Sequence, residues 1–525
     1  MLWLCPFFAK RLSGERNLAK IIPSIALILA LLAGCSGSRN TRIANDGRIA
    51  PPSIGNAAVD EGDAASDPFD ADDADPDDKT VEIRTYRFGL EQAMQWALGH
   101  NLSLATANDN VARSKFNVLA AAAEFEVKII PNANAGIGGG SSGTSTSRGM
   151  GLDLRKTIPF GTTATLSGKT DESAETSSTS VGIQLEQPLL RGLGVEVNKN
   201  NLLSAQFGML ASERSFVLYQ ENLTVSVVRG FYEIIRQREL LALNGKSAER
   251  TRGHLEAARA RERVGLASRI DVLRAEIQLR QSEDNLLSAQ QAYGDAVDRF
   301  RIMLGFGPQA DVDIDADLSF NEFSVDERQA LFLAMSNRLD LAQASDEILE
   351  AERYLRLAKN STLPELNLVV GFTRLGSGSD FAESSNLSDS AWTIGLATSS
   401  DVRRTAERAR YEQSKFELDA RGRSRQLLED TVVREVKDAL RRLEKNRKRI
   451  DIQKSETEHA QQKMRLAKMK FDRGLGDNFD LMAAEEEIIR AESNYLAAVT
   501  DYIVSQTEFK KAIGTLVERP AHLLR

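Results

Sequence analysis

Residues 261–280 read RERVGLASRIDVLRAEIQLR, and residues 470–489 read KFDRGLGDNFDLMAAEEEII. With Gly265 aligned on Gly474, an offset of 209 residues (474 − 265), the two stretches correspond without a gap. The same offset pairs further identical residues: Leu266/Leu475, Asp271/Asp480, Ala275/Ala484, Glu276/Glu485, Glu283/Glu492, Asn285/Asn494, Tyr293/Tyr502, Phe300/Phe509 and Gly305/Gly514. One ungapped register over roughly forty residues indicates an internal duplication.

Each copy of this stretch predicts two helices joined by a tight turn. Gly265 and Gly474 suit the left-handed residue that ends a helix. Ser268-x-x-Asp271 and Asp477-x-x-Asp480 follow as N-caps with a carboxylate in the first turn. Apolar residues then recur every seven positions: Val272, Leu279, Leu286, Tyr293 and Phe300, and Leu481, Ile488, Tyr495, Tyr502, Phe509 and Leu516. This spacing is typical of a coiled-coil seam, so each copy should contain a long helical hairpin with a capped tip.

The N-terminus predicts an export signal. The apolar run Ile21–Leu32 is too short to span a bilayer and follows several basic residues. It ends in Leu32-Ala33-Gly34-Cys35, which resembles a bacterial lipobox. We therefore expect residues 1–34 to be a lipoprotein signal peptide and Cys35 to carry covalent lipid. A chance cysteine behind a plain signal peptide is the alternative.

Residues 35–82 predict a disordered tether. Asp60–Asp78 is about half Asp and Glu with little apolar content, a composition that does not form a core. The only other cysteine, Cys5, lies in the expected signal peptide. The mature chain then has no internal disulfide and no cysteine metal cluster.

The remaining chain predicts two repeats, residues 83–320 and 321–525, each rich in long helices. We expect helices over Phe88–Phe125, Glu196–Val264, Asp271–Gly305, Glu322–Asn360, Val402–Arg473 and Asn478–Gly514. Ala97, Leu102 and Leu104 reappear as Ala334, Leu339 and Leu341, so the shorter helices are duplicated too. At 1.5 Å per residue the two longest helices reach about 100 Å, several times the diameter of a globular domain. These lengths predict a long rod or tube.

Between the first short helix and the long helix of each copy, apolar residues alternate with small or polar ones. The apolar positions are Ala133, Ala135 and Ile137; Met150, Leu152 and Leu154; Val181, Ile183 and Leu185; Leu366, Leu368, Val370 and Phe372; and Trp392, Ile394 and Leu396. Segments of about ten residues with this alternation fit transmembrane β-strands, with a soluble hairpin packed on helices as the alternative.

One β-hairpin per copy cannot close a barrel, and open sheet edges in lipid leave backbone groups unpaired. We therefore expect the strands of several identical chains to be pooled. The alternation around Ile158–Gly161 leaves open whether the first copy adds a second hairpin.

These features together resemble the outer-membrane efflux (TolC-like) family over about Val81–Leu516. The motifs that carry the resemblance are Gln187–Gly192 (QPLLRG), Leu363–Leu366 (LPEL), Val264–Leu273 (VGLASRIDVL) and Lys511–Leu516 (KAIGTL). The resemblance implies a mainly α fold with a small β part, in which a homotrimer forms an α-barrel and pools its β-hairpins into an outer-membrane β-barrel. It also implies a passive duct that meets a periplasmic adaptor (membrane-fusion) protein fed by an inner-membrane efflux or secretion pump.

Under this resemblance the helix tips are the candidate docking sites. We expect the adaptor to contact Gly265, Leu266, Ala267, Ser268, Gly474, Leu475, Gly476 and Asp477. Asp271, Asp477 and Asp480 should narrow the entrance as rings of like charge, although capping alone would explain Asp271 and Asp480.

The sequence departs from the family in two places. Ala483 stands where the family often has a second acidic residue, and Thr398–Asp401 replaces the usual turn before the second long helix.

Other functions find little support in the sequence. The four histidines lack metal-ligand spacing, and no phosphate loop or nucleophile motif occurs, so we expect no enzyme, no metal and no cofactor beyond the lipid. The Arg-rich run Arg403–Lys454 has interspersed acids and predicts an ion-paired helix face rather than nucleic-acid binding. We expect Glu485–Glu487 to face solvent or a lumen. A non-conducting, lipid-anchored coiled-coil spacer of the envelope remains the alternative to a channel.

Overall fold

The computed structural model describes residues 85–140, 143–173, 176–307, 310–314, 323, 325–473, 475 and 478–524. The chain divides into two units, Met1–Asp77 and Asp78–Arg525, and the described residues all belong to the second. The expected signal peptide, lipidated Cys35 and most of the acidic tether therefore lie in the first unit, outside the described residues.

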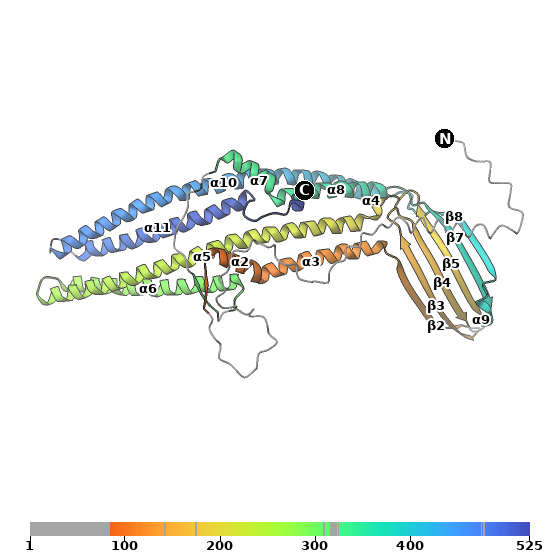
Figure 1. The fold of residues 1–525 in the computed structure, drawn as a ribbon, viewed down its shortest axis with the longest axis horizontal. Helices are drawn as coiled ribbons and strands as arrows, with labels where there is room; N and C mark the ends of the chain where they lie inside the picture. The colour runs from red at the N-terminus through yellow and green to blue at the C-terminus, as the bar shows by residue number, and fades with distance from the viewer. Residues whose placement is uncertain are drawn as a thin grey trace, which may run out of the picture. The chain divides into compact units, whose positions relative to one another are not determined.

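The expected long helices are present in both copies (Figure 1). Copy one contains α2 (Leu90–His100), α3 (Leu102–Ala122), α4 (Val195–Asn198), α5 (Asn200–Arg263) and α6 (Arg269–Leu304). Copy two contains α7 (Glu327–Asn337), α8 (Leu339–Ser361), α10 (Thr405–Asp472) and α11 (Asn478–Ala512). The short helix α9 (Phe381–Ser384) and the 3-10 helices η2 (Ala123–Phe125) and η3 (Ala521–Leu523) complete the helical elements described here. With 64 and 68 residues, α5 and α10 are about 96 and 102 Å long.

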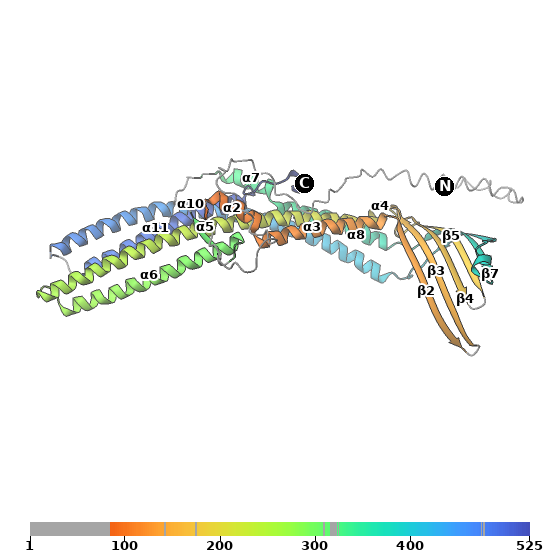
Figure 2. The same ribbon diagram turned by 60° about the horizontal axis from the view of Figure 1, so that its bottom comes forward.

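Each long helix packs along two shorter helices. Helix α5 contacts α6 over one part of its length and α3 over another, and α10 contacts α11 and α8 in the same way. Figures 1 and 2 show that the α5–α6 and α10–α11 tips lie at one end of this unit and the sheet at the other. The predicted seams are buried at Val272, Phe300, Leu481 and Tyr502, each at most 1% exposed. The heptad spacing therefore identified the packed faces.

The first short helix of each copy is interrupted at the same place, which the sequence analysis did not foresee. The backbone is extended at Asn101 (φ −68°, ψ 119°) and at Arg338 (φ −72°, ψ 122°). The Asn101 side chain accepts a hydrogen bond from the backbone N–H of Leu104 at 2.9 Å and so begins a new helix there. Asn101 is a favoured N-cap residue and Gly99 precedes it, whereas no Gly or Pro adjoins Arg338.

Two glycines at the ends of α6 and α11 allow the backbone to lie close to these breaks. Gly305 has φ +87°, and a Cβ atom there would lie 2.3 Å from the carbonyl oxygen of His100. Gly514 has φ +72°, and its Cβ would lie 3.1 Å from Cβ of Asn337. The two contacts occupy corresponding positions of the duplication.

Replacing Gly305 with alanine should therefore lower the free energy of unfolding by about 1–3 kcal/mol, through left-handed strain and the contact with His100. Gly294 is the matched control, because it lies inside α6 and a Cβ atom there would meet nothing within 4 Å. Gly294→Ala should be neutral or stabilise by up to about 1 kcal/mol, and denaturant unfolding measures both. Equal effects of the two substitutions would contradict the role of Gly305.

We expected one β-hairpin in each copy, and the first copy contains a second. Its six strands are β2 (Lys128–Gly140), β3 (Gly143–Thr157), β4 (Thr163–Ser173), β5 (Ser177–Pro188), β7 (Asn367–Gly378) and β8 (Asp389–Ala397). They pair in the order β2-β3-β4-β5-β7-β8, and every neighbouring pair is antiparallel. The turn at Ile158–Gly161, where Gly161 has φ +104°, joins β3 to β4 and supplies the second hairpin that the alternation left open.

A separate parallel pair was not predicted. Strand β1 (Thr85–Phe88) pairs with β6 (Asp311–Ile314), and this pair contributes Phe88, Val312 and Ile314 to the core around α2, α5 and α6. A second core lies between α7, α10 and α11. Each copy thus has its own hydrophobic centre at mid-length.

Polar side chains fix the segment Thr398–Asp401, which precedes α10. Thr398 Oγ1 donates to the carbonyl of Glu365 at 2.7 Å, and Ser400 Oγ accepts from the backbone N–H of Glu365 at 2.8 Å. Arg404 donates to the carbonyl of Thr362 at 2.7 Å. These bonds tie the start of α10 to the end of α8 and to the segment that follows it.

Candidate functional site

One face of the six-stranded sheet is apolar from edge to edge. Residues that pair across the strands lie on the same face, so the register aligns the alternating residues into rows. One row crosses all six strands: Ile129, Leu154, Leu166, Ile183, Phe372 and Trp392. The adjacent rows on this face include Leu152, Val181, Leu185, Val370 and Ile394. The predicted alternation is confirmed, and the structure joins the separate segments into one continuous surface.

The opposite face of the sheet is mainly polar, with Ile130, Val369 and Leu375 as its large apolar residues. The corresponding rows carry Asp153, Ser167 and Thr373, and Arg155, Thr165, Gln184 and Thr393. Asn132 donates to Asp153 at 3.1 Å, and Lys169 pairs with Asp171 at 2.8 Å. A sheet with one apolar and one hydrogen-bonding face suits a wall with lipid on one side and water on the other.

Charged residues limit the apolar face at both ends. Lys156 lies at the end near the helices, and Arg148, Glu172 and Arg374 lie toward the far end of the strands. The short helix α9 (Phe381–Ser384) also packs there, where Ser384 Oγ lies 3.0 Å from both Ser177 Oγ and Thr179 Oγ1. The apolar surface is therefore a band with defined limits rather than a whole face.

At the first tip, the end of α5 is a Schellman motif. Gly265 has φ +75°, its N–H donates to the carbonyl of Glu262 at 2.9 Å, and the N–H of Leu266 donates to Arg261 at 2.8 Å. Leu266 is 78% exposed, and Ala267 is half-buried. The predicted left-handed glycine is confirmed, and it turns an apolar side chain into solvent.

Ser268 and Asp271 form the predicted cap of α6. The N–H of Asp271 donates to Ser268 Oγ at 3.2 Å, and the Ser268 N–H and Oγ donate to the Asp271 carboxylate at 3.0 and 2.7 Å. These bonds from Ser268, together with Arg274, hold the pKa of Asp271 below its usual value. Capping thus accounts for the position of Asp271.

Replacing Ser268 with alanine should destabilise the first turn of α6 by about 0.5–2 kcal/mol, and so speed amide exchange there about two- to thirty-fold. Ser288, exposed inside the same helix, is the control, and Ser288→Ala should leave exchange unchanged or slower. Because the pKa of Asp271 is lowered in the folded chain, the cap should stabilise at neutral pH and weaken as the pH falls through that lowered pKa. Exchange rates insensitive to Ser268→Ala would contradict this role.

The second tip is described only in part. Gly474, Gly476 and Asp477 lie outside the described residues. The N–H of Leu475 donates to the carbonyl of Lys470 at 2.9 Å, the same bond that Leu266 makes at the first tip. Leu475 is 77% exposed, and Asp480 is exposed in the first turn of α11.

The structure brings the two helix starts together. A cavity of about 230 Å³ is lined by Asp271, Arg274, Ile277 and Gln278 of α6 and by Phe479 and Met482 of α11. Gln278 donates to Glu486 at 3.3 Å across the same interface. Ile270 and Phe479 are exposed by 60% and 62% beside the exposed leucines of the turns. The duplicated tips therefore present one apolar end surface, which the sequence analysis described only as two separate turns.

Glu485 corrects one expectation. Its side chain is buried, 3% exposed, and forms an ion pair with Arg250 of α5, whereas we expected it to face solvent or a lumen. Burial raises the pKa of Glu485 against the opposing effect of Arg250. Its counterpart in the first copy, Glu276, pairs with Arg259 at 2.6 Å on a more exposed face. Glu485 therefore joins the second copy to the first. Glu276 instead joins the two helices of one hairpin, α5 and α6.

The Arg-rich helix α10 forms the predicted ion pairs. Four of them lie within the helix at spacings of three or four residues: Lys415–Glu412, Arg421–Glu417, Arg425–Glu429 and Arg441–Asp438. The charged side chains of these four pairs are each paired with a neighbour on the same helix, as is typical of an exposed helix face.

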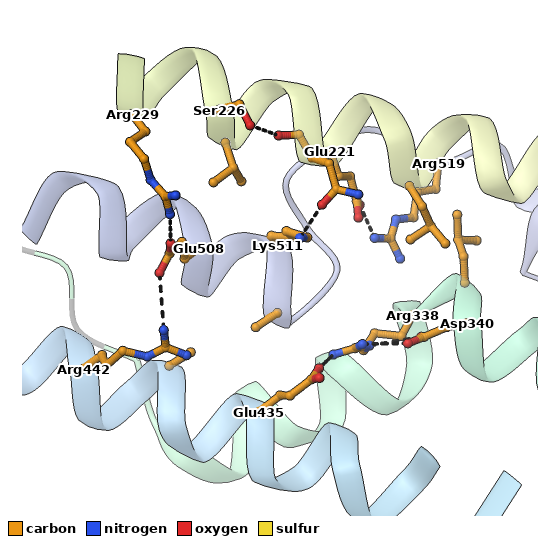
Figure 3. A pocket seen from close by; sticks show the side chains of 16 residues that line it. Glu221, Ser226, Arg229, Arg338, Asp340, Glu435, Arg442, Glu508, Lys511 and Arg519 are labelled. Carbon is orange, nitrogen blue, oxygen red and sulfur yellow. Dashed lines mark hydrogen bonds and ion pairs between the residues drawn. The ribbon is translucent and has the colours of Figure 1, made fainter. Parts of the chain in front are cut away.

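A charged cavity of about 520 Å³ lies at mid-length between α5, α8, α10, α11 and the segment after α11 (Figure 3). Arg519 forms an ion pair with Glu221 there, and their side chains are 5% and 2% exposed. Glu508 pairs with Arg229 and Arg442, and Arg338 pairs with Asp340 and Glu435 at 2.6 and 2.7 Å. Paired charges thus connect the two copies at their centre. Nothing in the sequence pattern indicated the pairs between the copies, because their partners, such as Arg519 and Glu221, are far apart in the chain.

Among the described residues, no helix combines the length and the apolar composition needed to cross a bilayer. Within the same residues, no group of three or more His, Cys, Asp or Glu side chains is placed to hold a metal ion.

Comparison with known proteins places these features in one family. The family profile described as outer membrane efflux protein matches residues 93–305 and 331–515, one segment in each copy. The outer membrane efflux protein BepC of Brucella suis is 30% identical over 109 residues, and this match spans 21% of the present chain and 23% of that relative.

Solved structures show the same fold. The CmeC outer membrane channel of Campylobacter jejuni superposes with a TM-score of 0.66 at 14% identity, covering 82% of this chain and 86% of that one. The outer membrane protein VceC of Vibrio cholerae gives 0.63 at 15% identity, covering 81% and 96%. The chain belongs to the outer membrane efflux protein family.

Proposed function

We propose that three copies of the chain form a passive duct across the outer membrane and that their helices continue this duct into the periplasm as a tube. The observation that carries the proposal is the apolar row that crosses all six strands while the opposite face stays mainly polar. Lipid would cover the apolar face, and the polar face would line a water-filled lumen. A non-conducting spacer would not need a sheet with one apolar and one polar face.

The helix tips are the proposed contact with a periplasmic adaptor protein that an inner-membrane pump supplies. Exposed apolar side chains gather there, Leu266 and Leu475 above all, at 78% and 77% exposure. A contiguous exposed apolar surface at the end of a helical body favours a protein partner. Gly265, Ala267 and Ser268 belong to the same surface, and we assign Gly474, Gly476 and Asp477 to it by the duplication.

Asp271, Asp477 and Asp480 would form rings of three carboxylates at the entrance of such a trimer. Rings of like charge favour cations and hydrated passage. The lipid on Cys35 and the acidic segment up to residue 82 would add an anchor in the outer membrane.

The double variant Leu266→Asp, Leu475→Asp tests the docking surface. Two carboxylates replacing central apolar contacts should lower export about tenfold or more, because truncating such anchors typically costs about 2 kcal/mol or more of binding. Phe332→Asp is the matched control, since Phe332 is 71% exposed on α7 away from the tips. Export is measured in cells with protein level and trimer content checked. Unchanged export in the double variant, with normal trimers, would exclude the tips as the docking site.

A further inference from the structure

We infer that the charged cavity at mid-length is a binding site for an oxyanion of the phosphate or sulfate class, held by Lys511 with Arg519 and Arg338 around it. The proposed duct assigns no role to this cavity, so the inference goes beyond the proposed function. The site is built within a single chain, where α5 of copy one meets α8, α10 and α11 of copy two.

The cavity carries one more positive than negative charge. Among the described residues that line it, five side chains are basic and four are acidic. Each of the four carboxylates is paired with an arginine of the same cavity, as described above. The four arginines therefore balance the four carboxylates, and the fifth basic residue, Lys511, supplies the surplus charge. A cavity with this balance favours an anion.

Lys511 has no acidic partner among the described residues. Its ammonium donates to Asn222 Oδ1, the neutral amide oxygen of a residue on α5. A lysine ammonium has three donor positions, so two are left for a ligand. Lysine binds phosphate as a point charge, and an ammonium that lines a polar cavity without a carboxylate partner is suited to that role.

Arg519 has donors to spare in the wall of the same cavity. Nη2 pairs with Glu221, whereas Nε and Nη1 are buried and have no hydrogen-bond partner within the described residues. Buried donors without a partner are rare in folded proteins, and a bound ion or water is a usual explanation for them. A small shift of the Arg519 guanidinium toward the cavity would give these donors a partner in a bound oxyanion.

The basic groups converge from separate elements. Lys511 lies in the last turn of α11, Arg519 in the segment that follows, and Arg338 at the break between α7 and α8. Figure 3 shows their charged ends directed toward the same space. The oxygens of a tetrahedral oxyanion can accept hydrogen bonds from several sides at once, whereas a monatomic anion such as chloride offers no such separate acceptors. This arrangement favours phosphate or sulfate over chloride.

The size of the cavity allows two sources of the oxyanion. Its volume of about 520 Å³ lies within the range of small-molecule sites, which is about 300–1,000 Å³. A free phosphate or sulfate ion fits, and so does such a group carried on a small solute. Either ligand would bridge the two copies of the duplication and stabilise the chain, since a ligand that binds only the folded state raises stability.

Titration calorimetry of the detergent-solubilised full-length protein with sodium phosphate tests the site. Phosphate should bind saturably, sulfate should compete with it, and sodium chloride of equal ionic strength should give no saturable binding. Glycerol 3-phosphate is titrated in parallel to distinguish the two sources. Tighter binding than that of inorganic phosphate would assign the site to a phosphorylated solute, and equal or weaker binding would assign it to the free ion.

Variants of Lys511 test which residue holds the ligand. Lys511→Gln removes the surplus charge and should weaken phosphate binding about tenfold or more, because it removes a charge-assisted hydrogen bond. Lys511→Arg keeps the charge and should retain binding. Lys510→Gln is the matched control, since Lys510 is exposed, does not line the cavity and places its ammonium 6.0 Å from the centre of the Phe323 ring. Helical circular dichroism and trimer content verify the fold of each variant.

Two results would overturn the inference. If phosphate binds the folded parent protein no better than chloride does at equal ionic strength, the cavity holds water alone. If Lys510→Gln and Lys511→Gln weaken phosphate binding equally, phosphate is attracted by the surface charge as a whole and not by this site. Both results concern anion binding and leave conductance untouched, so they are distinguishable from a failure of the proposed duct.

Discussion

Replacing Arg519 with methionine should lower the free energy of unfolding by about 3–5 kcal/mol, because it leaves a buried carboxylate without its partner. Glu221, that partner, is only 2% exposed in its side chain and lies on α5, far from Arg519 in the sequence. Denaturant unfolding of the detergent-solubilised protein, followed by helical circular dichroism, measures the change.

Two further variants separate the ion pair from other effects of the substitution. Arg229→Met removes an arginine from the same cavity, but Arg229 is 61% exposed, so its loss should cost no more than about 1 kcal/mol. The double variant Arg519→Met, Glu221→Gln removes both buried charges and should recover much of the lost stability. A single Arg519→Met variant as stable as Arg229→Met would contradict the account of this cavity (Figure 3).

Ile183→Arg should destabilise the membrane-inserted protein by about 2–4 kcal/mol, because it places a charge in the middle of the apolar face. Ile183 lies between Leu166 and Phe372 in the row that crosses the whole sheet. The expected readouts are fewer heat-modifiable trimers in outer-membrane fractions and a lower free energy of unfolding in lipid.

The adjacent residue provides the control. Gln184 points to the opposite face, between Thr165 and Gly371, so Gln184→Arg should leave assembly nearly unchanged and alter mainly the ion selectivity of the pore. If both variants assemble equally well, the apolar face is not in contact with lipid.

The helices were predictable because local chemistry determines them. Heptads, caps and the absence of proline placed α5, α6, α10 and α11 within a few residues of their observed bounds. The break at Asn101 was missed although Asn is a favoured N-cap, and the break at Arg338 has no side-chain cap that a sequence pattern could reveal. Period-two alternation likewise identified the strands of the large sheet. The order in which they pair, and the pairing of β1 with β6, depend on residues distant in the chain.

The candidate site was predictable to a similar degree. Gly265, Ser268 and Asp271 adopt the predicted turn and cap, since these depend on a few consecutive residues. The burial of Glu485 was mispredicted, because the face of a helix that meets a neighbouring hairpin is set by packing between the two copies. The end surface shared by Ile270 and Phe479 was missed for the same reason.

Single-channel recording of purified, unmodified trimers in planar lipid bilayers tests the central claim most directly. If identical chains share one amphipathic wall, each insertion should produce a discrete conductance step that persists without pump, adaptor or energy source. Purified trimers that insert into the bilayer without any conductance step, or a protein recovered as a water-soluble monomer with Ile183 and Phe372 shielded from lipid, would contradict it.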